Sequence, residues 1–573
     1  MPFNLCVVIL FLLATLSTTY VNASEKINLG FALIERSGCY GCHFIEKYQD
    51  WPKIGPNLEF IASKTTKEWA YHWIDDPKSI RFNTWMPSFF HQTNNSDPAS
   101  LKRSAQEIHA IVEYLFANSK TLVWDSYKTG DPVKGKKLFS SLGCLACHQI
   151  TDKKPEARRT RASLYHEFGA NLIGFGSETT EDWIVLWLTN PLRYNPQTRV
   201  PDFRLNVQEA SDIAAYLVQS KSPAVNKIIP PVDDGALNHP DPLVVDGRRL
   251  IKKYGCYSCH HIPGFEHEKP VGNELTEQDA RSKESWFKQK LMDPRSFDKA
   301  NRKETSDDLK MPNYNFTKEE AEAVTSALMM HQDSKVSVID EGMKTIRQFN
   351  CQACHRIDHE GGTIDNAVTD WLVKYQGKDI NEAQSLTKTF SPPSLMGEGQ
   401  KVQSKWLFEF LHHPTPIRPW LHMRMPTFFF HKDQVSSIVQ YFDAKDNHDH
   451  RLVDKIRVHM SAEELDAAKK LFSKDYFNCA SCHIVGKKMP EGSVDQWAPN
   501  FALAAKRLKP QWIIQWIANP SAILPGTKMP TFYDPKAIEA STPQDILKGD
   551  ARRQIKVLRD YLLTIDQHES EKN

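Results

Sequence analysis

Hydrophobic and polar positions along this chain repeat one short series of amphipathic helices. Five segments carry a Trp that is followed eight residues later by a Pro, at Trp69, Trp183, Trp286, Trp406 and Trp512. In three of them a second Trp stands four positions on, which puts it on the same helical face as the first. Because proline cannot continue a helix, each segment is predicted to be an amphipathic helix that ends at its proline, with the aromatic residues in the core.

Two further helices are predicted around each Trp helix. In four segments an opening helix starts at a Gly nine residues before a Cys, at Gly30, Gly135, Gly247 and Gly342. The fifth segment has Ala468 in the place of this Gly. A closing helix carries an aromatic or apolar pair at Tyr114-Leu115, Tyr216-Leu217, Ala327-Leu328, Tyr441-Phe442 and Tyr561-Leu562. We expect each closing helix to cross the opening helix of its own segment. Five small helical domains in tandem follow from this pattern.

The strongest chemical signal is the motif Cys-x-x-Cys-His, which follows each opening helix. The spacing is the attachment signature of c-type haem. Two thiols three positions apart on one helical turn can each bond a vinyl group of the porphyrin, while the adjacent His reaches the iron. Ten of the eleven cysteines lie in these pairs, and the eleventh is Cys6. The motifs are Cys39-Cys42-His43, Cys144-Cys147-His148, Cys256-Cys259-His260, Cys351-Cys354-His355 and Cys479-Cys482-His483.

Two other sites use Cys-x-x-Cys pairs, the zinc knuckle and the thioredoxin-like redox pair. A zinc site needs a second pair or a Cys/His partner set at a regular distance, and it does not require a His directly after the second Cys. The invariant His in five motifs therefore favours haem over zinc.

A Met-Pro pair stands between the Trp helix and the closing helix in four segments. The thioether of Met is a soft, neutral ligand that raises the reduction potential of haem iron, and the following proline restricts the loop. Met more often fills gaps in a core, but its recurrence at one place in the repeat favours a distal iron ligand. In the fourth segment Met423 competes with Met425, and the Met-Pro register selects Met425. The candidate ligands are Met86, Met311, Met425 and Met529.

With its opening helix, haem motif, Gly55-Pro56-Asn57-Leu58 loop and Met-Pro pair, the repeat resembles the class I cytochrome c domain. The resemblance implies an all-α fold with one covalent haem c per domain, five in all, each with its motif His as proximal ligand and its Met as distal ligand. Elsewhere Pro56 gives way to Ala170, Asn273 and, in the fourth segment, Ser394. The expected domains are residues 24–122, 127–222, 240–333, 336–446, with a loop enlarged at 361–390, and 460–567.

The second segment departs from the pattern because Val200 precedes its Pro and the segment contains no Met. Its only His besides His148 is His166, which lies between the haem motif and the Trp183 helix. We predict His166 as the distal ligand of this haem, which would give a bis-His site of lower potential. Three alternatives stay open: a five-coordinate iron, a bound water, and a ligand from an adjacent domain. His261, next to His260, and His91, after Met86, are further candidate ligands, although an exposed role is favoured for both.

The first residues read as an export signal. An apolar run from Leu5 to Leu16 precedes small residues and a cleavage site after Ala23, so residues 1–23 are predicted to be removed. The first four residues contain no Lys or Arg, which leaves an uncleaved anchor as the alternative. Haem attachment outside the bacterial cytoplasm, which the resemblance implies, agrees with export. We therefore predict a periplasmic protein, soluble or peripherally attached to a membrane.

Composition narrows the partners. The chain has 40% hydrophobic residues, a mean hydropathy of −0.50 and a formal charge of +2. Five haems would add about two negative charges each through their propionates, which makes the loaded protein mildly acidic. A basic nucleic-acid surface is not indicated.

The function predicted from these features is the transfer of single electrons to and from redox proteins or a membrane oxidoreductase complex, without a catalytic residue. An enzyme with an open second haem, acting on peroxide or a nitrogen oxide, is the first alternative. The second is the cytochrome subunit of a periplasmic dehydrogenase.

Overall fold

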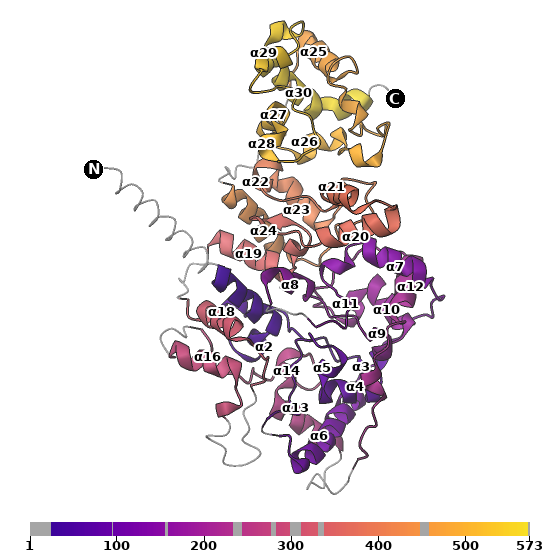
Figure 1. Ribbon diagram of the computed structural model, residues 1–573, viewed down its shortest axis with the longest axis vertical. Helices are drawn as coiled ribbons and strands as arrows, with labels where there is room; N and C mark the ends of the chain where they lie inside the picture. Colours follow the sequence, from indigo (N-terminus) through magenta and orange to yellow (C-terminus); the bar gives the residue numbers. More distant parts are fainter. Residues whose placement is uncertain are drawn as a thin grey trace, which may run out of the picture. The chain divides into compact units, whose positions relative to one another are not determined.

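The computed structural model describes residues 25–93, 95–154, 159–232, 243–276, 282–297, 311–330, 337–446 and 458–570. The predicted export signal at residues 1–23 lies outside them. The chain divides into two compact units, residues 1–335 and 336–573, and both are mostly helical, as predicted (Figure 1). None of the helices within the described ranges has the length and apolar character needed to cross a membrane.

The first unit holds the first three repeats. It begins with a helix at residues 25–37. Its further elements are α2 (Cys39–Cys42), η1 (Glu46–Tyr48), α3 (Ile61–Lys64), α4 (Lys67–Asp75), α5 (Pro77–Ile80), α6 (Pro98–Ala117), α7 (Pro132–Ser141), η2 (Cys144–Ala146), α8 (Arg161–His166), α9 (Phe175–Glu178), α10 (Glu181–Thr189), α11 (Pro191–Tyr194), α12 (Val207–Leu217), η3 (Pro223–Asn226), α13 (Leu243–Tyr254), α14 (Cys256–Cys259), α16 (Glu284–Met292) and α18 (Lys318–Leu328).

The second unit holds the last two repeats. Its elements are α19 (Val338–Gln348), η5 (Cys351–Ala353), β1 (Arg356–Ile357), β2 (Glu360–Gly361), α20 (Asp365–Gln376), α21 (Ile380–Phe390), α22 (Glu398–Lys401), α23 (Ser404–His412), α24 (Lys432–Lys445), α25 (Ala462–Phe472), η6 (Cys479–Ser481), η7 (Val494–Gln496), η8 (Phe501–Leu503), α26 (Ala504–Arg507), α27 (Pro510–Ala518), α28 (Pro520–Ile523), α29 (Ile538–Ser541), η9 (Leu547–Gly549) and α30 (Ala551–Ser570).

A small hairpin in the fourth repeat was not predicted. β1 and β2 pair antiparallel, with Arg356 opposite Gly361. The two residues between the strands, Asp358 and His359, both have positive φ angles, of 53° and 65°. This backbone is the one that a tight two-residue hairpin turn requires. The loop enlarged at 361–390 folds mainly into α20 and α21.

The five Trp helices form as predicted, and each ends two residues before its proline. In α4 and α10 the side chains of Thr66 and Thr180 cap the helix by accepting a hydrogen bond from the N–H of Trp69 and Trp183. The proline then opens the next short helix in α5, α11 and α28. The aromatic rings four residues apart stack, at 5.1 Å for Trp69 and Trp73. The core role expected of the Trp is wrong for Trp286, which is 46% exposed.

Opening and closing helices cross at the small residue that the sequence marks. A Cβ atom on Gly135 of α7 would lie 1.8 Å from the carbonyl oxygen of Asp212 in α12, and one on Gly342 of α19 would lie 2.3 Å from the Cβ of Tyr441 in α24. Only Gly permits so close an approach of two helices. In the fifth repeat α25 packs on α30, with Ala468 fully buried. The crossing within one repeat is thus confirmed for the second, fourth and fifth repeats.

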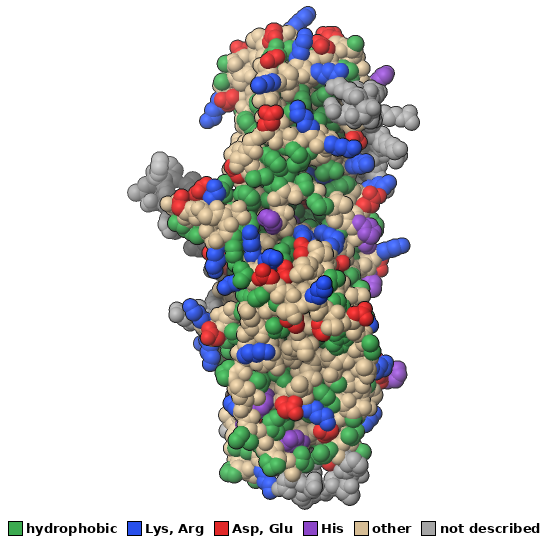
Figure 2. All heavy atoms as spheres, turned by 90° about the vertical axis from the view of Figure 1, so that its right-hand side faces the viewer, with side chains coloured by type: hydrophobic (Ala, Val, Ile, Leu, Met, Phe, Trp, Pro, Cys, Tyr) green, Lys and Arg blue, Asp and Glu red, His purple; other side chains and the backbone are tan. Residues whose placement is uncertain are grey.

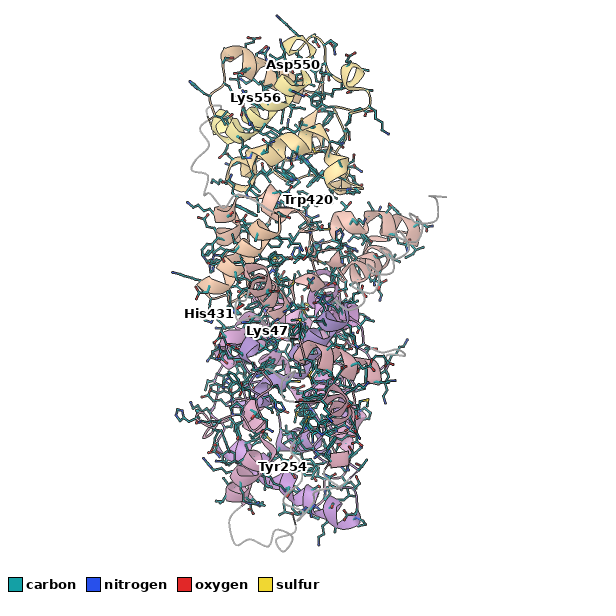
Figure 3. All side chains as sticks on the ribbon, turned by 90° about the vertical axis from the view of Figure 1, so that its left-hand side faces the viewer. Lys47, Tyr254, Trp420, His431, Asp550 and Lys556 are labelled. Atoms are coloured by element: carbon teal, nitrogen blue, oxygen red, sulfur yellow. The ribbon has the colours of Figure 1, made fainter. Side chains whose placement is uncertain are left out.

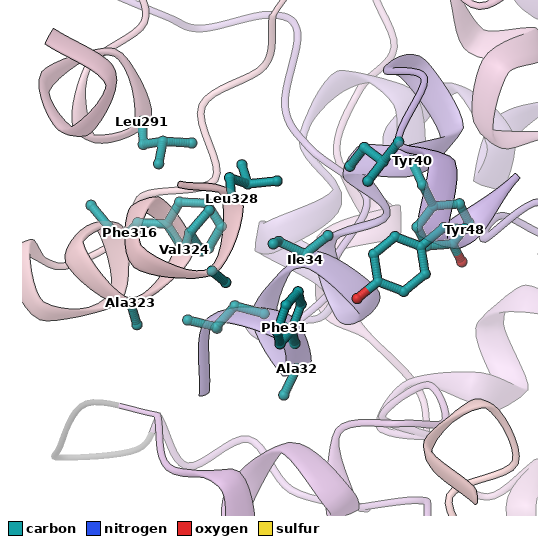
Figure 4. Close-up of a cluster of buried hydrophobic side chains, with 14 of the residues drawn as sticks. Phe31, Ala32, Ile34, Tyr40, Tyr48, Leu291, Phe316, Ala323, Val324 and Leu328 are labelled. Carbon is teal, nitrogen blue, oxygen red and sulfur yellow. The ribbon is translucent and has the colours of Figure 1, made fainter. Parts of the chain in front are cut away.

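The first and third repeats exchange these partners. A Cβ on Gly30 would lie 2.0 Å from the carbonyl oxygen of Ala323 in α18, and one on Gly247 of α13 would lie 2.0 Å from that of Ala110 in α6. In Figure 4, Phe31, Ala32 and Ile34 of the first opening helix lie together with side chains of the third closing helix. The predicted crossing within the first repeat and within the third repeat is therefore wrong, because the Gly of each opening helix packs against the closing helix of the other repeat.

Candidate haem sites

Each Cys-x-x-Cys-His motif forms one helical turn, as its spacing predicts. The residue before the first Cys has a left-handed backbone, which turns the chain out of the opening helix. This residue is Gly38, Gly143, Gly255, Asn350 or Asn478, with φ between 47° and 106°. The motif His then closes the turn through its backbone N–H, which donates to the carbonyl oxygen of the first Cys over 2.8 Å in the first motif and 3.0 Å in the second. A Gly or Asn at this position is a sequence signal that supplements the motif.

All five motif histidines are held in the same way. The Nδ1 atom of each lies 2.6–2.9 Å from a backbone carbonyl oxygen in the loop that resembles Gly-Pro-x-Leu. A carbonyl can only accept, so Nδ1 carries the proton and Nε2 keeps its lone pair for a metal. The pairs are His43 with Asn273, His148 with Ala170, His260 with Pro56, His355 with Pro393 and His483 with Pro499. In the fourth repeat the position of Pro56 thus belongs to Pro393, and the assignment to Ser394 is wrong by one residue.

The histidine rings are packed tightly against these loops. A Cβ on Gly55, Gly169 or Gly272 would come within 2.4–2.5 Å of an atom of the neighbouring imidazole, so a side chain there would displace the ring. Burial lowers the pKa of His260 and of His483 to about 4. The imidazoles are therefore neutral at physiological pH, which is the form that ligates iron.

The first and fifth Met-Pro loops share one local geometry. The backbone N–H of Met86 and of Met529 donates to the hydroxyl of the Thr two residues earlier, over 3.2 and 3.3 Å. Val200 makes the same bond to Thr198 over 3.0 Å. The alignment of Val200 with the Met positions is thereby confirmed. The Thr two residues ahead of Met86, Val200 and Met529 is a further sequence signal of this loop.

Aromatic contacts bring the Met-Pro loop to the haem motif. In the fifth repeat Phe477, two residues before the first Cys, packs on Phe532 and Tyr533, which follow Met529 by three and four residues. In the fourth repeat Phe349 packs in the same way on Phe428 and Phe430. Cys351 and Met425 also pack against one hydrophobic cluster. Candidate attachment and distal residues are thus brought together in the fourth and fifth repeats.

Buried polar atoms without a partner mark places that a further group would fill. Among the described residues, the indole nitrogens of Trp69 and Trp183 and the Nη1 atom of Arg199 are buried and have no hydrogen-bond partner. A buried donor without an acceptor costs free energy. Haem propionates are acceptors of the kind that these donors require. Together with the Cys pairs and the free Nε2 atoms of the histidines, these donors fit a covalently bound haem.

Two histidines lie near the second haem motif or the loop of Val200. His166, at the end of α8, has its Nδ1 atom 3.0 Å from the carbonyl oxygen of Leu145, inside the haem motif. His261 of the third repeat lies with Nε2 2.9 Å from the side-chain oxygen of Gln197, three residues before Val200. The loop of Val200 is therefore within reach of a His from another repeat, and His166 stays a prediction.

Two haem motifs lie against each other. The side chains of Cys42 and Cys259 are within hydrogen-bonding reach, and a Cβ on Gly41 would lie 3.1 Å from the carbonyl oxygen of Ser258. The Nζ atom of Lys53 also donates to the carbonyl oxygen of Tyr257 over 2.6 Å. The first and third attachment sites are therefore neighbours inside the first unit.

The zinc alternative finds no match in the described part of the chain, which contains no group of three His, Cys, Asp or Glu side chains placed to hold a metal ion. On the face shown in Figure 2, acidic and basic side chains are interspersed, as the small formal charge suggests.

Comparison with known proteins agrees with this geometry. Residues 132–221 match the model of the family described as Cytochrome c. This range contains the second haem motif, the Trp183 helix and the loop of Val200. No solved structure matches the chain. The match supports a cytochrome c domain over these residues, which implies covalently bound haem c and suggests haem-based electron transfer.

Proposed function

We propose that the protein is a pentahaem c-type cytochrome that carries single electrons between redox proteins in the periplasm. The observation that carries the proposal is the fivefold recurrence of one arrangement, a Cys pair followed by a His whose Nδ1 is held by a backbone carbonyl. Each bound haem would supply a one-electron Fe(III)/Fe(II) couple.

The chain's own residues act by holding and tuning this couple. The five histidines offer Nε2 to the iron, and Met86, Met311, Met425 and Met529 are proposed for the opposite face. A site closed by two protein ligands leaves no position for a substrate, which favours electron transfer over catalysis. The contact of Cys42 with Cys259 would bring two haem edges close together, as conduction along the chain requires.

Location and partners complete the proposal. Removal of residues 1–23 on export would release the chain into the periplasm, where peripheral contact with a membrane oxidoreductase complex is compatible with its composition. A stable partner polypeptide that copurifies in fixed ratio would instead favour the subunit of a dehydrogenase.

A redox titration of the loaded protein tests the proposal. We expect four haems of higher potential with an absorption band from Met sulfur to ferric iron, and one haem of lower potential. Met529→Ala should weaken that band by about a quarter, as expected for one of four Met-ligated irons. Met489→Ala is the control within the same repeat, because this Met is 43% exposed and its Met-Pro pair precedes the Trp512 helix, outside the position of the candidate ligands. A wild-type spectrum without the band would contradict the ligand assignment.

A haem enzyme is the second candidate, and Val200 is the observation that favours it. Val offers no lone pair to iron, so the second site stays open unless another residue closes it. Binding of carbon monoxide to one reduced haem of the wild-type protein would support this candidate.

A further inference from the structure

We propose that the first and third repeats exchange their axial ligands. The haem attached at Cys39 and Cys42 is then held by His43 and Met311, and the haem attached at Cys256 and Cys259 by His260 and Met86. The inference rests on the proposed function, since it assigns protein ligands to two of the five haems. It replaces the pairing within each repeat that the resemblance implies.

The helix crossings are the first argument. Gly30, in the opening helix of the first motif, receives α18, and Gly247 in α13 receives α6. The helix at residues 25–37 and α18 lie side by side in Figure 1. Ion pairs span the same two crossings, from Lys253 to Glu107 over 3.2 Å and from Lys26 to Glu322 over 3.7 Å. The opening helix and the closing helix of one haem pocket thus come from different repeats.

The loops whose carbonyl oxygens hold the motif histidines are exchanged between the same two repeats. Nδ1 of His43 is held by Asn273, 230 residues away, and Nδ1 of His260 by Pro56, 204 residues away. Backbone hydrogen bonds repeat the exchange. Gly272 donates to the carbonyl oxygen of Cys42, and Gly55 donates to that of Cys259, each over 2.8 Å. In the second repeat Gly169 makes the same bond to its own Cys147.

The Met-Pro loops follow their new partners. Phe89 and Phe90, three and four residues after Met86, pack on Tyr254, with ring centroids 5.6 and 5.3 Å apart. Tyr254, which is labelled in Figure 3, stands two residues before Cys256. These contacts are the ones that Phe532 and Tyr533 make with Phe477 inside the fifth repeat. The loop of Met86 therefore belongs to the third motif.

Met311 makes the reciprocal contact. Met311 and Tyr314 pack together with Cys39 against one hydrophobic cluster, as Met425 does with Cys351 inside the fourth repeat. Backbone pairing of Ser88 with Asn313, each two residues after its Met, joins the two loops. Each of the two Met-Pro loops thus lies against the haem motif of the other repeat.

Combined variants test the exchange through the Met-to-iron band of the ferric protein. In the variant C256A/C259A the third haem cannot attach. The exchange predicts that Met86→Ala in this background leaves the band unchanged, while Met311→Ala reduces it by about a third, because three Met-ligated irons remain. The opposite result, with Met311→Ala silent and Met86→Ala reducing the band, would overturn the exchange.

The same variants separate this inference from the proposed function. Intact mass must show the loss of one haem and no more, and the band must be present before either Met is replaced. Absence of the band from the wild-type protein contradicts the proposed function, whereas a band with the wrong Met dependence contradicts only the exchange. The variant C39A/C42A gives the reciprocal test, in which Met311→Ala is expected to be silent.

A second measurement leaves every haem in place. A zero-length carbodiimide link requires a Lys in direct contact with a carboxylate that the reagent can reach, so the wild-type protein should yield a link from Lys26 to Glu322, whose side chains are 41% and 27% exposed. Lys67 and Glu113, 2.7 Å apart within the first repeat and 47% and 34% exposed, are the matched control pair. The control link without the link from Lys26 to Glu322 would overturn the exchange, even where the Cys variants do not fold.

Discussion

Replacing Glu178 by Gln removes a buried carboxylate that joins the second repeat to the first. Its two oxygens lie 2.5 Å from Nη2 of Arg81 and 2.5 Å from Nζ of Lys64. The Glu178 side chain is 3% exposed, and those of Arg81 and Lys64 are 5% and 17% exposed. Glu178→Gln leaves both cations buried without their counter-charge.

The size of the effect follows from the pKa. Burial alone would raise the pKa of Glu178, but the charges of Arg81 and Lys64 outweigh it and lower the pKa from 4.5 to about 2. A group whose pKa is lower in the folded state stabilises the fold above its unfolded pKa and loses that contribution as the pH falls. The contribution is about 3 kcal/mol, fully present above pH 4.5 and lost toward pH 2. Removing one partner of a buried pair costs about 3–5 kcal/mol at neutral pH.

Hydrogen exchange of the loaded protein measures this cost locally. Peptides covering α9 should lose protection in Glu178→Gln. The wild type is expected to lose protection between pH 4.5 and 2, and this loss in acid should be smaller in the variant. Glu59→Gln is the matched control, because Glu59 pairs with Lys120 at the same distance of 2.5 Å on the surface, with side-chain exposures of 31% and 65%. Equal effects of the two substitutions would refute the reasoning, since exposed pairs contribute little.

Two further predictions concern the distal faces. Trp73 donates its indole N–H to the sulfur of Met86 over 2.8 Å, which withdraws charge from the thioether. Trp73→Phe should therefore lower the reduction potential of one haem in a redox titration. An unchanged or higher potential would contradict this role of the hydrogen bond. At the second haem, paramagnetic resonance should show a low-spin bis-His signal that His166→Ala converts to a high-spin, carbon monoxide-binding state; if His261→Ala has this effect instead, the ligand comes from the third repeat.

Much of the fold was predictable because short sequence patterns specify the helices of each repeat. Trp-Pro spacing predicted the Trp helices to within two residues of their ends, and Gly135 and Gly342 predicted where helices cross. The exchange between the first and third repeats was not predictable. Gly30 and Gly247 stand at equivalent positions of their opening helices, and the closing helices of the two repeats are also alike. The local sequence pattern therefore does not determine which closing helix packs against which Gly.

The candidate sites divide in the same way. The Cys pairs and their histidines follow from spacing alone, and the structure gives all five histidines one orientation. The carbonyl that orients each His was beyond the sequence, because Asn273 and Pro56 reach His43 and His260 only through long-range packing. The role of Trp286 failed for a related reason: Phe287 and Leu291 of the same helix face the core and leave Trp286 outside.

The central claim is that the chain carries five covalent haems. Mass spectrometry of the purified protein under denaturing conditions, after extraction with acid and acetone, tests it most directly. We predict the mass of the chain from residue 24 onward plus five haems, because each motif offers two thiols and no other cysteine remains after the export signal is removed. A chain with fewer than five haems, or one that loses haem to the extraction, would contradict the account.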